Sequence, residues 1–85
     1  MNEFRTNQYQ CSGYLRDLGS IIREKALEAK KTSDATTDDS DRGFSLGRLM
    51  AFHEVVSLMQ QQAGAFDISL GEIGLADINP EKDLL

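Results

Sequence analysis

The residue types best able to do chemistry gather in residues 47–62, GRLMAFHEVVSLMQQQ, which set the only histidine, His53, between two methionines. Methionine and histidine are ligands for soft metals. On a helix, Met50 and His53 can approach each other because they are three residues apart, but Met59 points to the other side. Two weak ligands do not complete a metal site. We therefore expect no metal or cofactor here, and place His53 on a polar helix face with solvent or a neighbouring glutamate as its partner.

A second possibility is nucleophilic catalysis by Cys11 with His53 as the base, which requires the two side chains within hydrogen-bonding reach. Cys11 belongs to a predicted buried stripe and His53 to a polar face, so the sequence does not favour this pair. As the only cysteine, Cys11 also has no disulfide partner within the chain, and neither CxxC nor zinc-type Cys/His spacing occurs. These features predict a protein of a reducing compartment that is not an enzyme.

The acidic residues of the chain concentrate in residues 32–42, TSDATTDDSDR, where no large apolar side chain occurs. We expect an exposed, mobile loop over residues 32–43, which cannot hold carboxylates in a catalytic geometry. The spacing after Asp34, Asp38 or Asp39 also lacks the glycine and glutamate of a calcium-binding loop. The glycines follow neither of the phosphate-binding patterns GxxxxGK[ST] and GxGxxG.

The overall charge points away from nucleic acids. Nine Lys plus Arg against fourteen Asp plus Glu give the 85-residue chain a formal charge of -5. Non-specific binding to DNA or RNA depends on cations that meet phosphates, so we expect a protein partner instead. The first residues, MNEFRTNQYQ, do not resemble a signal peptide, and no apolar run has the length of a membrane span. The sequence therefore predicts a cytoplasmic protein without a membrane partner.

Residues 7–31 have the periodicity of an amphipathic helix. At 3.6 residues per turn, one arc of about 140° collects the apolar side chains, which we expect to be buried. They are Cys11, Tyr14, Leu15, Leu18, Ile21, Ile22, Ala26 and Ala29. Gly19 lies near the edge of this stripe, where the missing side chain would admit a close neighbour.

Residues 45–65 predict a second helix, with Asp41 or Ser45 as its N-cap and Gly64 as a stop signal. Its apolar arc spans about 200°, more than one partner helix can cover. One partner is the first helix, folded back antiparallel. The other is the C-terminal tail, a second copy of the protein, or both.

The tail, residues 67–85, contains two helix-start signals. Ser69 and Glu72 have capping-box spacing, and Asn79 precedes a proline at a first helical position. We expect one or two short turns that pack back on the hairpin. Their apolar residues are Leu70, Ile73, Leu75, Ile78, Leu84 and Leu85.

Residues 60–74, QQQAGAFDISLGEIG, resemble a helix-turn-helix in the spacing of Ala63, the turn near Asp67 and Ile73. The resemblance implies, as an alternative function, a DNA-binding transcriptional regulator. Asp67 replaces the turn glycine, however, and residues 70–75 contain Glu72 but no Arg or Lys to contact phosphates or bases.

Together these patterns predict an all-α fold: an antiparallel two-helix hairpin with a short, partly helical C-terminal tail. Since the chain is small and the second helix has a wide apolar arc, we expect a homodimer that forms a four-helix bundle. The predicted interface consists of Leu49, Phe52, Val55, Val56, Leu58 and Met59. The expected function is that of a non-enzymatic protein-interaction module: an adaptor, regulator or neutralising partner of another protein.

Overall fold

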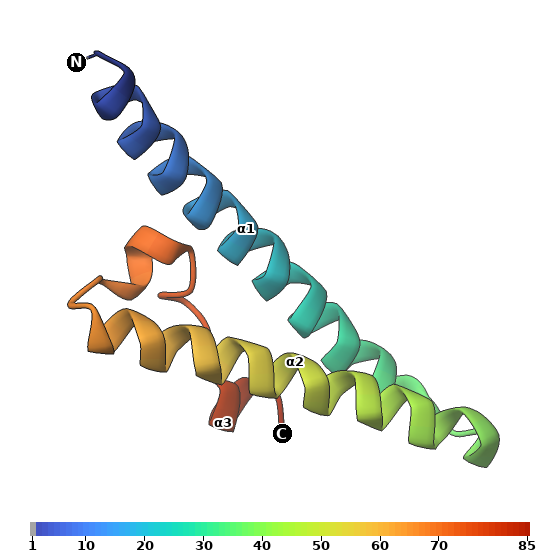
Figure 1. The fold of residues 1–85 in the computed structure, drawn as a ribbon. Coiled ribbons are helices and arrows are strands. Elements are labelled where there is room, and N and C mark those ends of the chain that lie inside the picture. The colour runs from blue at the N-terminus through green and yellow to red at the C-terminus, as the bar shows by residue number, and fades with distance from the viewer. Residues whose placement is uncertain (1) are drawn as a thin grey trace.

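Two long helices folded back on each other make up most of the protein. The computed structural model describes the backbone of residues 2–85 and the side chains of residues 7–85. Helix α1 spans Asn2–Ala35 and α2 spans Asp39–Ala65; the 3-10 helix η1 (Leu70–Ile73) and helix α3 (Pro80–Asp83) follow in the tail (Figure 1). The described residues contain no strand. The predicted all-α hairpin is therefore confirmed.

The connection between the two long helices is much shorter than predicted. Only residues 36–38 lie outside both helices, so the prediction of a loop over residues 32–43 is wrong. Thr36 prolongs the end of α1, because its Oγ1 donates a hydrogen bond to the carbonyl oxygen of Thr32 at 2.6 Å. The acidic residues on the other side belong to the first turn of α2. There, negative charge is favourable because it meets the positive end of the helix dipole.

The N-cap of α2 is Asp38, and the prediction of Asp41 or Ser45 is wrong. The Asp38 carboxylate accepts a hydrogen bond from the backbone N–H of Ser40 at 3.1 Å. Ser45 is instead buried within α2, where its Oγ lies 3.3 Å from Oγ1 of Thr36. This contact fixes the closed end of the hairpin.

The tail forms the two short turns that the sequence predicts. The Ser69 hydroxyl accepts a hydrogen bond from the N–H of Glu72 at 3.3 Å and so caps η1. The Asn79 side chain caps α3, accepting from the N–H groups of Glu81 and Lys82, with Pro80 at the start of the helix. Both signals were correct because each places a side-chain acceptor where backbone N–H groups lack a partner.

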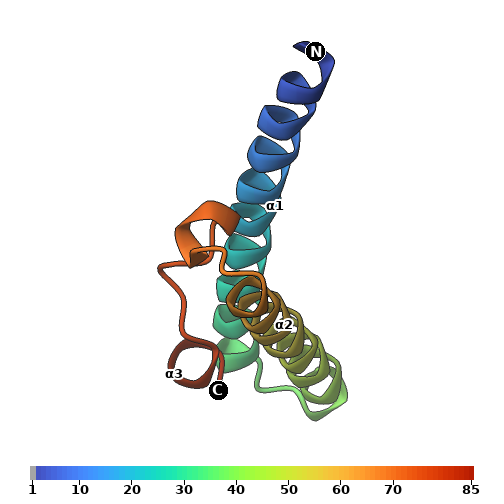
Figure 2. The same cartoon turned by 60° about the vertical axis from the view of Figure 1, so that its left-hand side comes forward.

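The tail returns along one side of the hairpin and completes its core (Figure 2). Leu75, Leu84 and Val56 are the largest side chains that are fully buried. The other buried apolar residues are Ala26, Ala29, Leu49, Ala63, Ile73 and Ile78. The core therefore has three contributors, and most of its large side chains come from the tail.

A close crossing of α1 and the tail is possible because of two glycines. A Cβ atom on Gly19 would lie 1.6 Å from the carbonyl oxygen of Ile73. One on Gly74 would lie 2.4 Å from the carbonyl oxygen of Arg16, and Gly74 also has a positive φ of 72°. The suggestion that Gly19 admits a close neighbour is confirmed.

The first half of α1 extends past the rest of the protein (Figure 1). All residues from 7 to 17, which we call the arm, are exposed. The prediction that Cys11, Tyr14 and Leu15 are buried is therefore wrong. The reason is length: α1 has 34 residues and α2 only 27, and Leu15 already lies level with the last turns of α2. Ile21, beyond the arm, was also expected to be buried and is 41% exposed.

The protein is long and thin for its size. Its extents are 57 × 21 × 16 Å and its radius of gyration is 15.5 Å, whereas a compact 85-residue domain would have a radius of gyration of about 12 Å. Its accessible surface is 6296 Å², compared with about 5,000 Å² for a compact monomer of this mass. Each chain thus exposes roughly 1,300 Å² more than a compact fold would.

Candidate interaction surface

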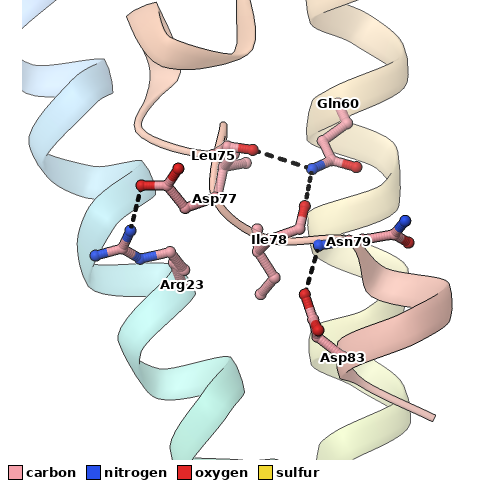
Figure 3. A network of polar contacts seen from close by, with 7 residues as sticks. All are labelled: Arg23, Gln60, Leu75, Asp77, Ile78, Asn79 and Asp83. Carbon is pink, nitrogen blue, oxygen red and sulfur yellow. Dashed lines mark hydrogen bonds and ion pairs between the residues drawn. The ribbon is translucent and has the colours of Figure 1, made fainter.

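The contacts of the tail define one flank of helix α2. The Gln60 side-chain amide donates two hydrogen bonds through Nε2, to the carbonyl oxygens of Leu75 at 3.1 Å and Ile78 at 2.8 Å (Figure 3). On the same side of the helix, Nε2 of His53 lies 3.7 Å from Oε1 of Glu81 in α3. Gln60 and His53 therefore face the tail.

The tail also contacts one flank of helix α1. Arg23 Nη1 lies 3.4 Å from Oδ2 of Asp77 (Figure 3), and Lys30 Nζ donates a hydrogen bond to the carbonyl oxygen of Leu85 at 2.7 Å. The tail thus bridges the two long helices from one side, as Figure 2 also shows. Within the tail, Asp83 accepts a hydrogen bond from the N–H of Asn79 at 2.8 Å, which holds α3 in place.

The opposite flank of α2 is apolar and uncovered. Val55 and Leu58 are 42% and 58% exposed. They lie about 140–160° around the helix from Gln60, at 3.6 residues per turn. Leu58 is at the far edge of this flank, because it also lines the hollow that contains His53 and Glu81. Between this flank and the core lie Phe52 and Met59, which are half-buried and pack against the core from its edge. An apolar stripe therefore continues from the core onto the surface.

The flank of α1 that faces away from the tail is also apolar and uncovered. Tyr14 and Ile21 are 66% and 41% exposed, and Leu18 between them is half-buried. These three residues lie about 140–180° around α1 from Arg23, which contacts the tail. Since each stripe faces away from the tail on its own helix, both lie on the same side of the hairpin.

We name this side of the hairpin the open face and define it by seven residues. They are Tyr14, Leu18 and Ile21 of α1, and Phe52, Val55, Leu58 and Met59 of α2. At the end nearest the arm, an apolar groove of about 200 Å³ runs between Leu15, the last turns of α2 and the start of the tail. The open face is thus continuous with the exposed side chains of the arm.

The residues of the predicted interface fall into two groups. Leu49 and Val56 are buried within the core of their own chain. Val55 and Leu58 are exposed on the open face, and Phe52 and Met59 lie between the core and that face. The structure adds Tyr14, Leu18 and Ile21, which the sequence assigns to the buried stripe of the first helix. The unequal lengths of the two predicted helices were the signal for the exposure of Tyr14. Leu18 and Ile21 lie on the part of α1 that runs beside α2 and are uncovered because they face away from the tail.

The geometry does not assemble a catalytic or metal site from the described residues. Residues 7–85 hold no group of three or more His, Cys, Asp or Glu side chains able to bind a metal. Cys11 and His53 line separate hollows that share no residue. Asp38, Asp39 and Asp41, expected in a loop, serve the start of α2 instead. What the arrangement offers is an apolar surface suited to binding.

The segment that resembles a helix-turn-helix does not contain a recognition helix. Residues 70–73 form the 3-10 helix η1, whose Ile73 is buried at the crossing with α1. A recognition helix instead projects side chains freely into a DNA groove. No observation on this segment favours the DNA-binding alternative.

Comparison with known proteins does not assign the chain to a family. No protein-family model matches it, no curated protein is similar to it, and no solved structure matches its fold. Within the described residues, none of the helices combines the length and apolar character needed to cross a membrane. The function must therefore be inferred from the open face itself.

Proposed function

We propose that the protein is a non-enzymatic protein-interaction module that acts through its open face. The single observation that carries this proposal is that both long helices place exposed and half-buried apolar side chains on the side away from the tail. A contiguous apolar patch on a small protein marks a binding site, because leaving it in water is unfavourable.

The first partner we propose is a second copy of the same chain. The excess surface of roughly 1,300 Å² per chain is larger than the ~800 Å² that each partner contributes to a standard interface. Two open faces packed together would bring four long helices into a four-helix bundle. In this dimer Phe52, Val55, Leu58 and Met59 would meet the partner, while Leu49 and Val56 would remain in the core of each protomer.

The distribution of charge supports the same contact. The tail carries five acidic residues and a single lysine, so it accounts for most of the formal charge of -5. Because the tail covers the other side of the hairpin, two copies that meet through their open faces keep these acidic segments apart. Repulsion between two acidic chains would therefore weaken a dimer formed through the open faces less than a dimer formed through the tails.

The test is to compare two exposed aliphatic residues on opposite sides of α2. Val55→Glu would place a carboxylate within the proposed interface and is expected to raise the dimer dissociation constant at least about tenfold. Leu46→Glu is the matched control, since Leu46 is 49% exposed and lies about 180° around the helix from Val55. Sedimentation equilibrium measures both dissociation constants, and circular dichroism verifies that both variants remain helical.

A folded wild-type monomer at micromolar concentration would refute the homodimer. Equal dissociation constants for the two variants would instead place the interface away from the open face. Either result would refute the homodimer through this surface.

A further inference from the structure

We propose that the arm of one copy packs antiparallel to α1 of a second copy and lies across that copy's open face, with the reciprocal contact formed at the same time. The proposal rests on the homodimer proposed above and changes its arrangement: α2 of each copy would pack against the partner's arm, and the two α2 helices would lie end to end instead of side by side as in a four-helix bundle. It assigns a partner to the arm, whose residues 7–17 are all exposed.

The arm has an apolar side that no packing in its own chain stabilises. Residues 7–17 are all exposed, whereas most of the stability of helices in proteins comes from packing of an apolar face. The arm nevertheless continues an apolar stripe: Cys11, Tyr14, Leu18 and Ile21 follow one another at intervals of three, four and three residues. This spacing is that of the seam along which two helices pack in a coiled coil.

The stripe also selects the alignment of the two copies. In an antiparallel pair that centres on residue 16, Cys11 meets the partner's Ile21 and Tyr14 meets the partner's Leu18, and symmetry repeats both pairs. Moving the partner by seven residues in one direction would place Lys25 against Tyr14. Moving it in the other direction would place Asn7 against Leu18. Only the alignment centred on residue 16 pairs all four apolar residues with one another.

The same alignment covers the exposed part of α2. Leu15 shares a groove with Met59 and Ala63, and Thr36 contacts Ser45, so the second half of α1 runs beside α2 in the opposite direction. The partner's residues 7–14 would lie level with residues 18–25 of α1, beside Val55 and Leu58. One symmetric contact would therefore cover both the stripe of the arm and the α2 side of the open face.

Disulfide trapping can test this alignment, because Cys11 is exposed and is the only cysteine. The Ile21→Cys variant would place a new thiol opposite Cys11 of the partner copy. Diamide, which oxidises two thiols to a disulfide and is itself reduced, is expected to convert most of this variant to a covalent dimer on a non-reducing gel. Since Ile21 is 41% exposed, the substitution should leave the fold intact.

Two controls distinguish the proposed alignment from other dimers. In the wild type, the two Cys11 thiols would be ten residues apart along the antiparallel pair, about 15 Å, too far for a disulfide. The combined Cys11→Ser and Ile21→Cys variant has its two thiols equally far apart. Neither protein should cross-link under the same oxidation.

The outcomes separate this inference from the proposed function. If light scattering shows a dimer but Ile21→Cys does not cross-link, the arm alignment is wrong and the interaction through the open face remains. Cross-linking of the wild type would also overturn the alignment, because it would bring together the two Cys11 thiols that an antiparallel pair centred on residue 16 keeps apart. If the protein is a monomer, both the alignment and the homodimer are refuted.

Discussion

The two halves of α1 have the same apolar periodicity but very different surroundings. In the second half, Ala26 and Ala29 are fully buried against α2 and the tail, and Gly19 meets the backbone of the tail. In the first half, Tyr14 is 66% exposed and a Cβ atom on Gly13 would have no neighbour within 4 Å. The difference shows that an amphipathic stripe predicts a helix and its binding side, whereas the lengths of the neighbouring elements decide what covers it.

The strongest way to test this contrast is to add one methyl group to each half of α1. Gly19→Ala is expected to destabilise the protein by about 3 kcal/mol or more, because the tail backbone would have to move away. Gly13→Ala is expected to stabilise it by up to about 1 kcal/mol, since Ala favours the helix and no contact is disturbed. Urea unfolding at one fixed protein concentration measures both values. Similar effects at the two positions would show that the halves do not differ as described.

A smaller effect is expected at the side chain that fastens the tail to α2. Gln60→Ala removes both hydrogen bonds to the carbonyl oxygens of Leu75 and Ile78. Leaving these carbonyl groups without a partner should cost about 1–3 kcal/mol of the free energy of unfolding. The control is Gln61→Ala, on an exposed neighbouring residue, which should change stability by less than about 0.5 kcal/mol. Thermal unfolding of the two variants, run side by side, measures the difference, and equal midpoints would contradict the role of Gln60.

The smallest effect is expected at the ion pair between Arg23 and Asp77. Asp77 is 83% exposed in its side chain, and the two charged atoms lie 3.4 Å apart. Exposed pairs of this kind contribute at most about 1 kcal/mol and weaken with added salt. Asp77→Asn should therefore lower the unfolding midpoint only slightly, and the difference from wild type should vanish at about 1 M NaCl. A large loss of stability that persists in high salt would contradict this expectation.

The sequence predicted those features that depend on local chemistry. The caps at Ser69 and Asn79 and the glycine contact at Gly19 follow from residue types that satisfy backbone groups or leave space. The sequence failed where the outcome depends on competition between neighbours. Asp39 and Asp41 were assigned to a loop because residues 32–42 contain no large apolar side chain, although acidic residues also suit the first turn of a helix.

The candidate surface was predicted in part, for a similar reason. The wide apolar arc of the second helix correctly indicated more than one partner, but the arc alone could not separate Val56, which the tail and α1 bury, from Val55, which remains exposed. That division depends on the direction from which the tail returns. The direction is fixed by long-range contacts of Gln60 and Arg23, for which the sequence holds no periodic signal.

The position of the tail has a consequence for the speed of folding. The contacts that fasten it join residues 54 and 55 positions apart, Arg23 to Asp77 and Lys30 to Leu85. The helices themselves depend only on local contacts and can form early, but the core lacks Leu75 and Leu84 until these distant segments meet. Because long-range closure slows folding, the hairpin should exist for a time with its core uncovered, unlike a simple helical hairpin. During that interval both of its sides, not only the open face, would be exposed to other chains.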